Sequence, residues 1–170
     1  MRANLWGLVL PLSGALAMLC CAGTAEAQRR WEGFYLGGNM ALVFDADDYA
    51  KSLHMGLRAP WKGLLLGTEL ELSETDIGAP GGPIRNLDHV KLTLGGGSNQ
   101  FLYYASGGLA VARGRFGAEA GAVLGVGIDY ALSPHLSLGA EMQHHIFPDF
   151  NGSGRDPDIN TLTARVTWTF

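Results

Sequence analysis

The stretch Thr161-Leu-Thr-Ala-Arg-Val-Thr-Trp-Thr-Phe170 decides the fold, because apolar and polar side chains alternate along it. Successive side chains of a β-strand point to opposite faces, so this segment predicts a strand with one apolar and one polar face. The apolar face carries Leu162, Ala164, Val166, Trp168 and Phe170, and the polar face carries Arg165 and the threonines. The length and the pattern are those of a tilted strand that crosses a membrane.

The same period of two recurs upstream of this stretch. It is found in residues 34–42, 53–59, 64–73, 89–94, 101–113, 122–130 and 136–146. After Gln28 there is no run of about 18 apolar residues, so no transmembrane helix is expected there. The alternation predicts an all-β fold, an eight-stranded antiparallel up-and-down transmembrane β-barrel.

The connections between these segments support a membrane barrel. Three of them are tight, namely Pro60–Gly63, Gly97–Gln100 and Ser133–His135. Four are longer and richer in Asp, Gly and Pro, namely Asp45–Ser52, Glu74–Asp88, Gly114–Gly121 and Phe147–Asn160. Outer-membrane barrels have short periplasmic turns and longer extracellular loops. The alternation therefore predicts both ends of the barrel domain in the periplasm and an outer-membrane location in a Gram-negative bacterium.

The N-terminal segment has the features of a secretory signal peptide. Arg2 supplies the positive charge, and an apolar run from Leu5 to Ala22 follows. Ala25 and Ala27 form an A-x-A cleavage site, so the mature chain is expected to begin at Gln28. The domain division is therefore a signal peptide over 1–27 and a barrel domain over 28–170. An uncleaved membrane helix and a lipoprotein start are the alternatives.

Composition excludes several classes of protein. The net charge of −4 argues against a nucleic-acid partner, because such binders carry a basic face. The 25 glycines among 170 residues argue against a helical bundle, since glycine costs about 1 kcal/mol per helical position. The hydrophobic content of 47% excludes a disordered chain. Both cysteines lie in the signal segment, so no disulfide is expected in the mature chain.

The charges on the polar face of the strands are few and balanced. They are Arg58, Lys62, Glu69, Glu71, Lys91, Asp129, Glu141 and Arg165, four of each sign. A solvated outer face of a soluble barrel carries more charges, whereas buried charges are tolerated when they are compensated. An eight-stranded barrel has an interior that side chains can fill. We therefore expect a lumen network of Arg58, Glu69, Glu71, Lys91, Asp129, Glu141 and Arg165. A narrow porin is the less favoured alternative.

Several segments carry a resemblance to a known family. They are Trp31–Asn39, Phe101–Ala110, Gly127–Ser133, Leu138–Met142, Asp158–Val166 and the terminal Phe170. Together they resemble the outer-membrane immunogenic protein family of alphaproteobacteria, a branch of the opacity-type, OmpA-like small β-barrels. The resemblance implies roles in envelope integrity, surface antigenicity and contact with a host or a ligand. Residues 43–60 depart from the family pattern, which leaves the role of the first loop, 43–52, open.

The C-terminal alternation has a second interpretation. A terminal aromatic residue with apolar residues at every second position resembles the signal that the outer-membrane assembly machinery reads. Leu162, Ala164, Val166, Trp168 and Phe170 would carry that signal through strand addition. The alternative is that Phe170 simply packs in an aromatic girdle. Partners expected from these considerations are the assembly machinery, periplasmic chaperones, outer-membrane lipid and lipopolysaccharide, and a host-surface ligand of the loops.

Catalysis and metal binding have weak support. His144 and His145 suggest a comparison with lipid A 3-O-deacylases, which resemble this architecture, but Ile146 and Phe147 follow where a nucleophile is needed. Ser153 lies in a glycine-rich loop. The sets His144, His145, Asp149 and Asp45, Asp47, Asp48 lack the spacing of zinc and calcium sites. We therefore expect no enzymatic activity, no cofactor and no specific metal. His144 is expected at the lipid interface and His145 in the lumen.

Overall fold

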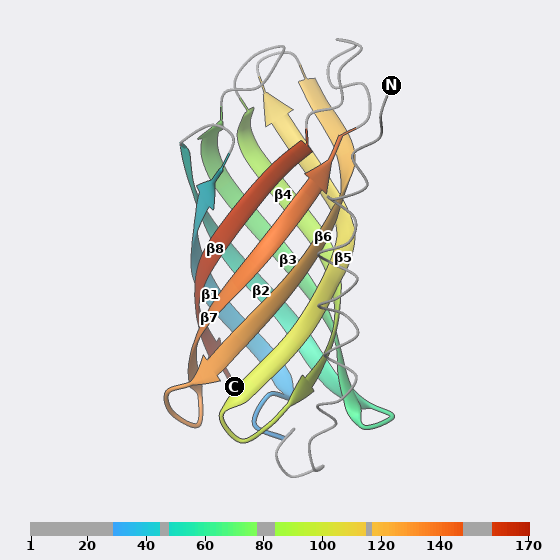
Figure 1. Cartoon of the computed structure of the whole chain (residues 1–170), viewed down its shortest axis with the longest axis vertical. Coiled ribbons are helices and arrows are strands. Elements are labelled where there is room, and N and C mark those ends of the chain that lie inside the picture. The colour runs from blue at the N-terminus through green and yellow to red at the C-terminus, as the bar shows by residue number, and fades with distance from the viewer. Residues whose placement is uncertain (1–28, 45–47, 78–83, 115–116, 148–157) are drawn as a thin grey trace.

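The computed structural model describes residues 29–44, 48–77, 84–114, 117–147 and 158–170. These residues form eight antiparallel strands in one closed barrel, in which β1 pairs with both β2 and β8 (Figure 1). The strands are β1 (Gly33–Val43), β2 (Asp48–Trp61), β3 (Leu64–Ile77), β4 (Ile84–Gly97), β5 (Phe101–Gly114), β6 (Gly117–Ala131), β7 (Leu136–Ile146) and β8 (Asp158–Thr169). The predicted fold class is therefore confirmed. Among the described residues, no helix has the length and apolar character needed to span a membrane.

The alternation of faces is the physical basis of the barrel. In β8, Val166 and Trp168 are exposed on the outside, as is Phe170 directly after the strand, while Arg165 and Thr167 are buried inside. The other strands repeat this arrangement, with leucine, valine and methionine outside. The apolar side chains face outward and the polar side chains face the interior, which is the reverse of a soluble barrel. The outer surface therefore requires lipid around it. The predicted division of the C-terminal stretch into two faces is confirmed.

The tight turns lie at the end of the barrel that also holds the C terminus (Figure 1). Between β2 and β3, Lys62 and Gly63 have φ values of 51° and 80°. Positive φ at both central residues is the requirement of a two-residue hairpin turn of type I′. At the β4–β5 turn, Ser98 donates its backbone N–H to Phe101 O at 2.7 Å.

The predicted long loops are wrong in their bounds. Strands occupy residues 48–52, 74–77, 84–88 and 117–121, which the sequence pattern assigned to loops. In β5 and β6 the ladder continues to a pair between Gly114 and Gly117, so the strict alternation of long and short connections fails there. The reason is that the ladder extends past the apolar band, where Asp, Glu and Gly are compatible with a strand that faces water. The signal segment 1–27, Ala25, Ala27 and Gln28 lie outside the described residues.

Candidate functional site in the barrel lumen

The middle of the barrel interior holds a buried layer of charged side chains. They come from six strands: Arg58 from β2, Glu69 and Glu71 from β3, Lys91 from β4, Asp129 from β6, Glu141 from β7 and Arg165 from β8. None of these residues is more than 4% exposed. The structure thus places all seven residues of the predicted lumen network inside the barrel.

Lys91 and Arg165 are the centres of this layer. Lys91 Nζ lies 2.9 Å from Glu69 Oε1, 2.9 Å from Glu71 Oε2 and 3.3 Å from Glu141 Oε2. Arg165 Nη2 lies 2.6 Å from Glu69 Oε2, and Arg165 Nη1 contacts Glu141 Oε2. Each cation therefore joins strands from opposite walls of the barrel. Buried charges need such compensation, because desolvation without a partner costs several kcal/mol per ion.

A second pair lies apart from this cluster. Arg58 Nη2 lies 3.3 Å from Asp129 Oδ2, and its guanidinium carbon is 4.1 Å from the centroid of the Tyr35 ring. The Tyr35 hydroxyl in turn donates to Glu69 Oε2 at 2.9 Å. Tyr35 thus links the Arg58–Asp129 pair to the central cluster. Tyr35 lies in the alternating segment 34–42, but the sequence pattern gave it no role.

Neutral side chains complete the hydrogen bonding of the carboxylates. Asn39 Nδ2 and Ser52 Oγ donate to Glu71 Oε1 at 2.9 and 2.6 Å. Ser106 Oγ donates to Glu141 Oε1 at 2.7 Å. Buried carboxylates are stabilised when several donors saturate their oxygens. Sequence reasoning missed these contributors: the alternation of segments 34–42 and 101–113 put Asn39 and Ser106 on the same face as the charges, whereas Ser52 fell in a predicted loop that the structure shows to be part of β2.

Glycines provide the room that this layer needs. A Cβ at Gly127 would overlap the ring of Tyr104, and a Cβ at Gly139 would overlap the carboxylate of Asp129. Tyr104 and Asp129 both point into the lumen and are at most 2% exposed. The glycine content of the chain therefore serves close packing across a narrow interior.

The two consecutive histidines, His144 and His145, occupy different environments. His145 is fully buried, and its Nε2 lies 2.9 Å from Nε2 of His89, which comes from β4. His144 faces the outside and lies 2.9 Å from Asn160 Oδ1. The expected positions of His144 and His145 on opposite faces are both observed. The pairing of His145 with His89 was not foreseen, because residues 56 positions apart meet only through the barrel register.

One histidine lies beside a hydroxyl group. His54 Nε2 is 2.9 Å from Thr167 Oγ1. This is the spacing of a base and its nucleophile. However, His54 is 0% and Thr167 1% exposed, so the pair is enclosed in the lumen. His54 Nδ1 has no hydrogen-bond partner among the described residues, so no third group orients the imidazole.

Apolar layers lie on both sides of the charged layer. On one side, toward the β7–β8 connection, the layer consists of Val43, Ile84, Leu87, Ala110, Ala112, Val123, Phe147 and Ile159. On the other side, near the tight turns, it consists of Trp31, Leu65, Leu102, Tyr104 and Ala131. Trp31 is 1% exposed and donates its indole N–H to Ser98 O at 2.9 Å. The described interior is therefore filled in three layers, apolar, charged and apolar.

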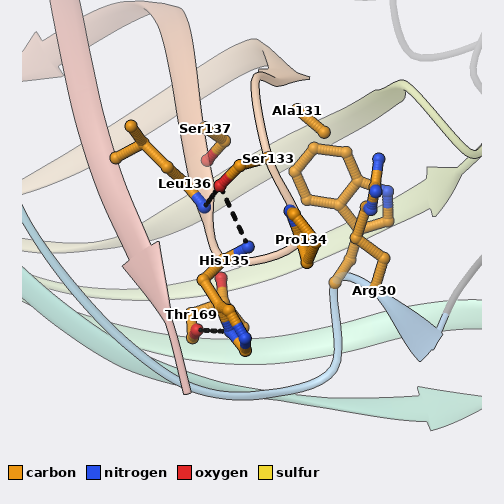
Figure 2. Close-up of a pocket in the computed structure, with 9 residues that line it drawn as sticks. Arg30, Ala131, Ser133, Pro134, His135, Leu136, Ser137 and Thr169 are labelled. Atoms are coloured by element: carbon orange, nitrogen blue, oxygen red, sulfur yellow. Dashed lines mark hydrogen bonds between the residues drawn. The ribbon is translucent and has the colours of Figure 1, made fainter.

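The hollow at the rim of the tight turns is small. Figure 2 shows the hollow between Arg30, Pro134, His135 and Thr169. Its volume is about 10 Å³, which is at the limit for a single water molecule. His135 Nδ1 lies 2.9 Å from Thr169 O and closes its side. No group of three or more metal-ligating side chains occurs among the described residues, and Asp45, Asp47, Asp149 and Ser153 lie outside them.

A closed sheet with an apolar outer face and a charged interior defines an integral membrane β-barrel protein. The family described as outer membrane protein beta-barrel domain matches residues 13–170. The chain belongs to this family, and its location is the outer membrane of a Gram-negative bacterium. No curated protein matches the chain.

Solved structures share the fold at low sequence identity. A barrel from the de novo design of transmembrane beta-barrels has a TM-score of 0.54 and 13% identity, over 82% of this chain and 97% of that one. Neisserial surface protein A (NspA) has a TM-score of 0.50 and 15% identity, over 81% and 97%. Ail, the attachment invasion locus protein of Yersinia pestis, has a TM-score of 0.49 and 11% identity, over 82% and 99%. The first two likenesses concern the fold alone.

Proposed function

We propose that the protein is a sealed structural barrel that contributes to envelope integrity and presents its extracellular end to the surroundings. The observation that carries this proposal is the filled interior. Lys91 and Arg165 connect opposite walls of the barrel, and apolar layers lie on both sides of them. A structure of this kind is stable in the membrane and leaves its outer end free for contact.

The narrow-porin alternative is disfavoured by the same layers. An ion would have to pass Trp31, then the contacts of Lys91 with three carboxylates, and then the apolar layer around Phe147. Porins, the outer-membrane barrels that conduct solutes, have 16–18 strands and a water-filled lumen. We therefore propose that the protein conducts no solute.

The enzyme alternative, a lipid A deacylase, is disfavoured by the histidine environments. His144 contacts Asn160 on the outer face, and His145 contacts His89 in the lumen. Among the described residues, the one hydroxyl within hydrogen-bond distance of a histidine side-chain nitrogen is that of Thr167, and it is enclosed with His54. A substrate lipid would not reach that pair. We propose that the protein has no enzymatic activity.

We further propose that the chain belongs to the alphaproteobacterial outer-membrane immunogenic branch of the family. The segments Trp31–Asn39 and Phe101–Ala110 support this placement. Contact with a host surface or a ligand would then occur through the extracellular connections. The assembly machinery and periplasmic chaperones would be its partners in biogenesis, and the alternation that ends at Phe170 supports that part.

Gene deletion with complementation tests this function. A strain that lacks the gene should become more sensitive to detergent and to bulky antibiotics, and the wild-type gene should restore resistance. A His145→Ala variant that accumulates normally should restore it equally, because the proposal requires no catalysis. Unaltered permeability and unaltered surface adhesion in the deletion strain would contradict the proposal. A shift in lipid A mass on overexpression, lost in His145→Ala, would establish the enzyme instead.

A further inference from the structure

The regular residue pairing between β3 and β4 is interrupted near the end of the barrel opposite the tight turns, and we call this interruption the notch. Paired residues run to Glu71 and His89, and the next pair is Glu74 with Asn86. Within the notch, Ser73 donates its backbone N–H to Asp88 Oδ1 at 3.3 Å, and Asn86 Nδ2 donates to Ser73 O at 3.1 Å. Polar side chains of the outer face thus take the place of backbone partners.

A hollow of about 420 Å³ opens at this notch. Its lining residues are Lys51, Ser52, Leu53, Leu72, Ser73, Glu74, Asn86 and Asp88. Leu53 and Leu72 pair across β2 and β3 and are 64% and 48% exposed on the outer face. Lys51 and Glu74 pair two residues further from the tight turns. The hollow is therefore apolar toward the membrane centre and polar toward the extracellular end.

One cationic side chain, Lys51, lines the polar part of the hollow, and two more belong to residues next to the lining residue Asn86: Arg85 precedes it in β4 and Arg113 pairs with it from β5. The register between β4 and β5 shifts between Ile84 and Asn86, which makes Arg85 the extra residue of a β-bulge. Bulges re-aim side chains, and Arg85 and Asn86 are both exposed. Arg113, opposite Asn86, forms an ion pair with Asp88 and is 54% exposed. No described residue forms an ion pair with Lys51 or Arg85.

We propose that this hollow binds the lipid A portion of lipopolysaccharide, a phosphorylated and acylated disaccharide of the outer leaflet. Lys51 and Arg85 bind a phosphate group, since ammonium and guanidinium groups form charge-assisted hydrogen bonds with phosphate oxygens. Asn86 and Glu74 accept hydrogen bonds from sugar hydroxyl groups. Leu53 contacts an acyl chain. Arg113 offsets the charge of Asp88, and Lys51 and Arg85 together exceed the charge of Glu74 by one, so the region keeps one surplus positive charge.

The location favours this ligand over a soluble anion. The hollow lies in the outer wall, beside the apolar band and at the end opposite the tight periplasmic turns. Lysine and arginine side chains close to a membrane surface attract anionic lipid head groups. The inference goes beyond the proposed function, because it concerns the lipid-facing wall and not surface contact. Its failure would leave the sealed structural barrel unaffected.

Lipid retention by the purified protein tests the proposal. The protein is extracted from outer membranes in mild detergent, and its binding of bisphosphorylated lipid A is measured by native mass spectrometry. The site variant is Lys51→Gln with Arg85→Gln. The matched control is Arg30→Gln with Lys62→Gln, which removes the same charge at the periplasmic end. We expect binding at least about tenfold weaker in the site variant and unchanged in the control.

Each other outcome overturns the proposal. Equal binding by all three proteins would exclude a site at this hollow, and equal losses in both variants would show a general charge effect. Dephosphorylated lipid A should bind at least about tenfold more weakly than the bisphosphorylated form, and equal binding would refute phosphate recognition. Heat-modifiable gel migration verifies that each variant is folded. If the double variant does not fold, the single variant Lys51→Gln is measured against Lys62→Gln.

Discussion

Replacing Lys91 with methionine should strongly destabilise the barrel. The Lys91 side chain is fully buried and contacts Glu69, Glu71 and Glu141 at 2.9 to 3.3 Å. Methionine has similar bulk, so packing is largely kept and the loss is electrostatic. Removing one partner of a buried ion pair costs about 3–5 kcal/mol, because the other charge stays buried without compensation. The unfolding equilibrium constant should therefore rise by about two to three and a half orders of magnitude.

The size of the effect follows from the charge balance of the layer. The lumen network holds three cations and four carboxylates, and the substitution leaves two cations. A second substitution, Glu71→Gln, removes one of the carboxylates that Lys91 neutralises. The double variant should thus be less destabilised than the sum of the single variants, by about 0.5–3 kcal/mol.

Reversible urea unfolding of the refolded protein in lipid vesicles measures these free energies. Tryptophan fluorescence and heat-modifiable gel migration report the folded fraction. The control is Lys62→Met at the exposed β2–β3 turn, where the ammonium lies 5.1 Å from the centroid of the Trp61 ring. That change should cost less than about 1 kcal/mol. If Lys91→Met and Lys62→Met have equal effects, the central role of the Lys91 contacts is refuted.

Further predictions concern the two faces of the wall and its last residue. Val90 is 62% exposed on the outer face, so Val90→Arg should cost about 2–4 kcal/mol in lipid vesicles, and a change near zero would contradict a lipid-facing position. Gly127→Ala should cost about 1–3 kcal/mol because its Cβ would overlap Tyr104, whereas Gly38→Ala, whose nearest neighbour is 3.9 Å away, should be tolerated; equal unfolding midpoints would refute this. Phe170→Ala should slow accumulation in the outer membrane several-fold with little change in unfolding in vitro, because the side chain is 68% exposed; unchanged pulse-chase kinetics would argue for a girdle residue alone.

The sequence was sufficient to predict which side chains face the lumen. A period of two leaves only two choices for each strand, and placing Arg165 or Glu141 in lipid is far more costly than placing a leucine there. The burial of both residues inside the barrel follows from that choice. The strand count followed from the same pattern.

The strand ends could not be predicted in this way. Glu74 and Asp88 have the composition of a loop, yet both lie in strands. The ladder continues beyond the lipid, where no apolar requirement marks its course. Hydrophobic periodicity reports the membrane-embedded part of a strand and not its full hydrogen-bonded length.

The partners within the lumen were also beyond the sequence. Arg165 and Glu69 are 96 residues apart, and their contact depends on the stagger of the closed sheet. His89 meets His145 for the same reason. Trp31 precedes the first strand, so no alternation identified it as an interior residue. Pairings across a barrel require its register, which local pattern does not contain.

Conductance measures the central claim of a sealed barrel most directly. Purified protein is reconstituted into a planar lipid bilayer, and its insertion is verified by heat-modifiable migration of the recovered sample. With Trp31, the Lys91 contacts and the apolar layer around Phe147 in place, we expect no discrete conductance steps in molar salt. Stable, uniform steps that scale with the amount of protein would contradict the sealed interior and establish a pore.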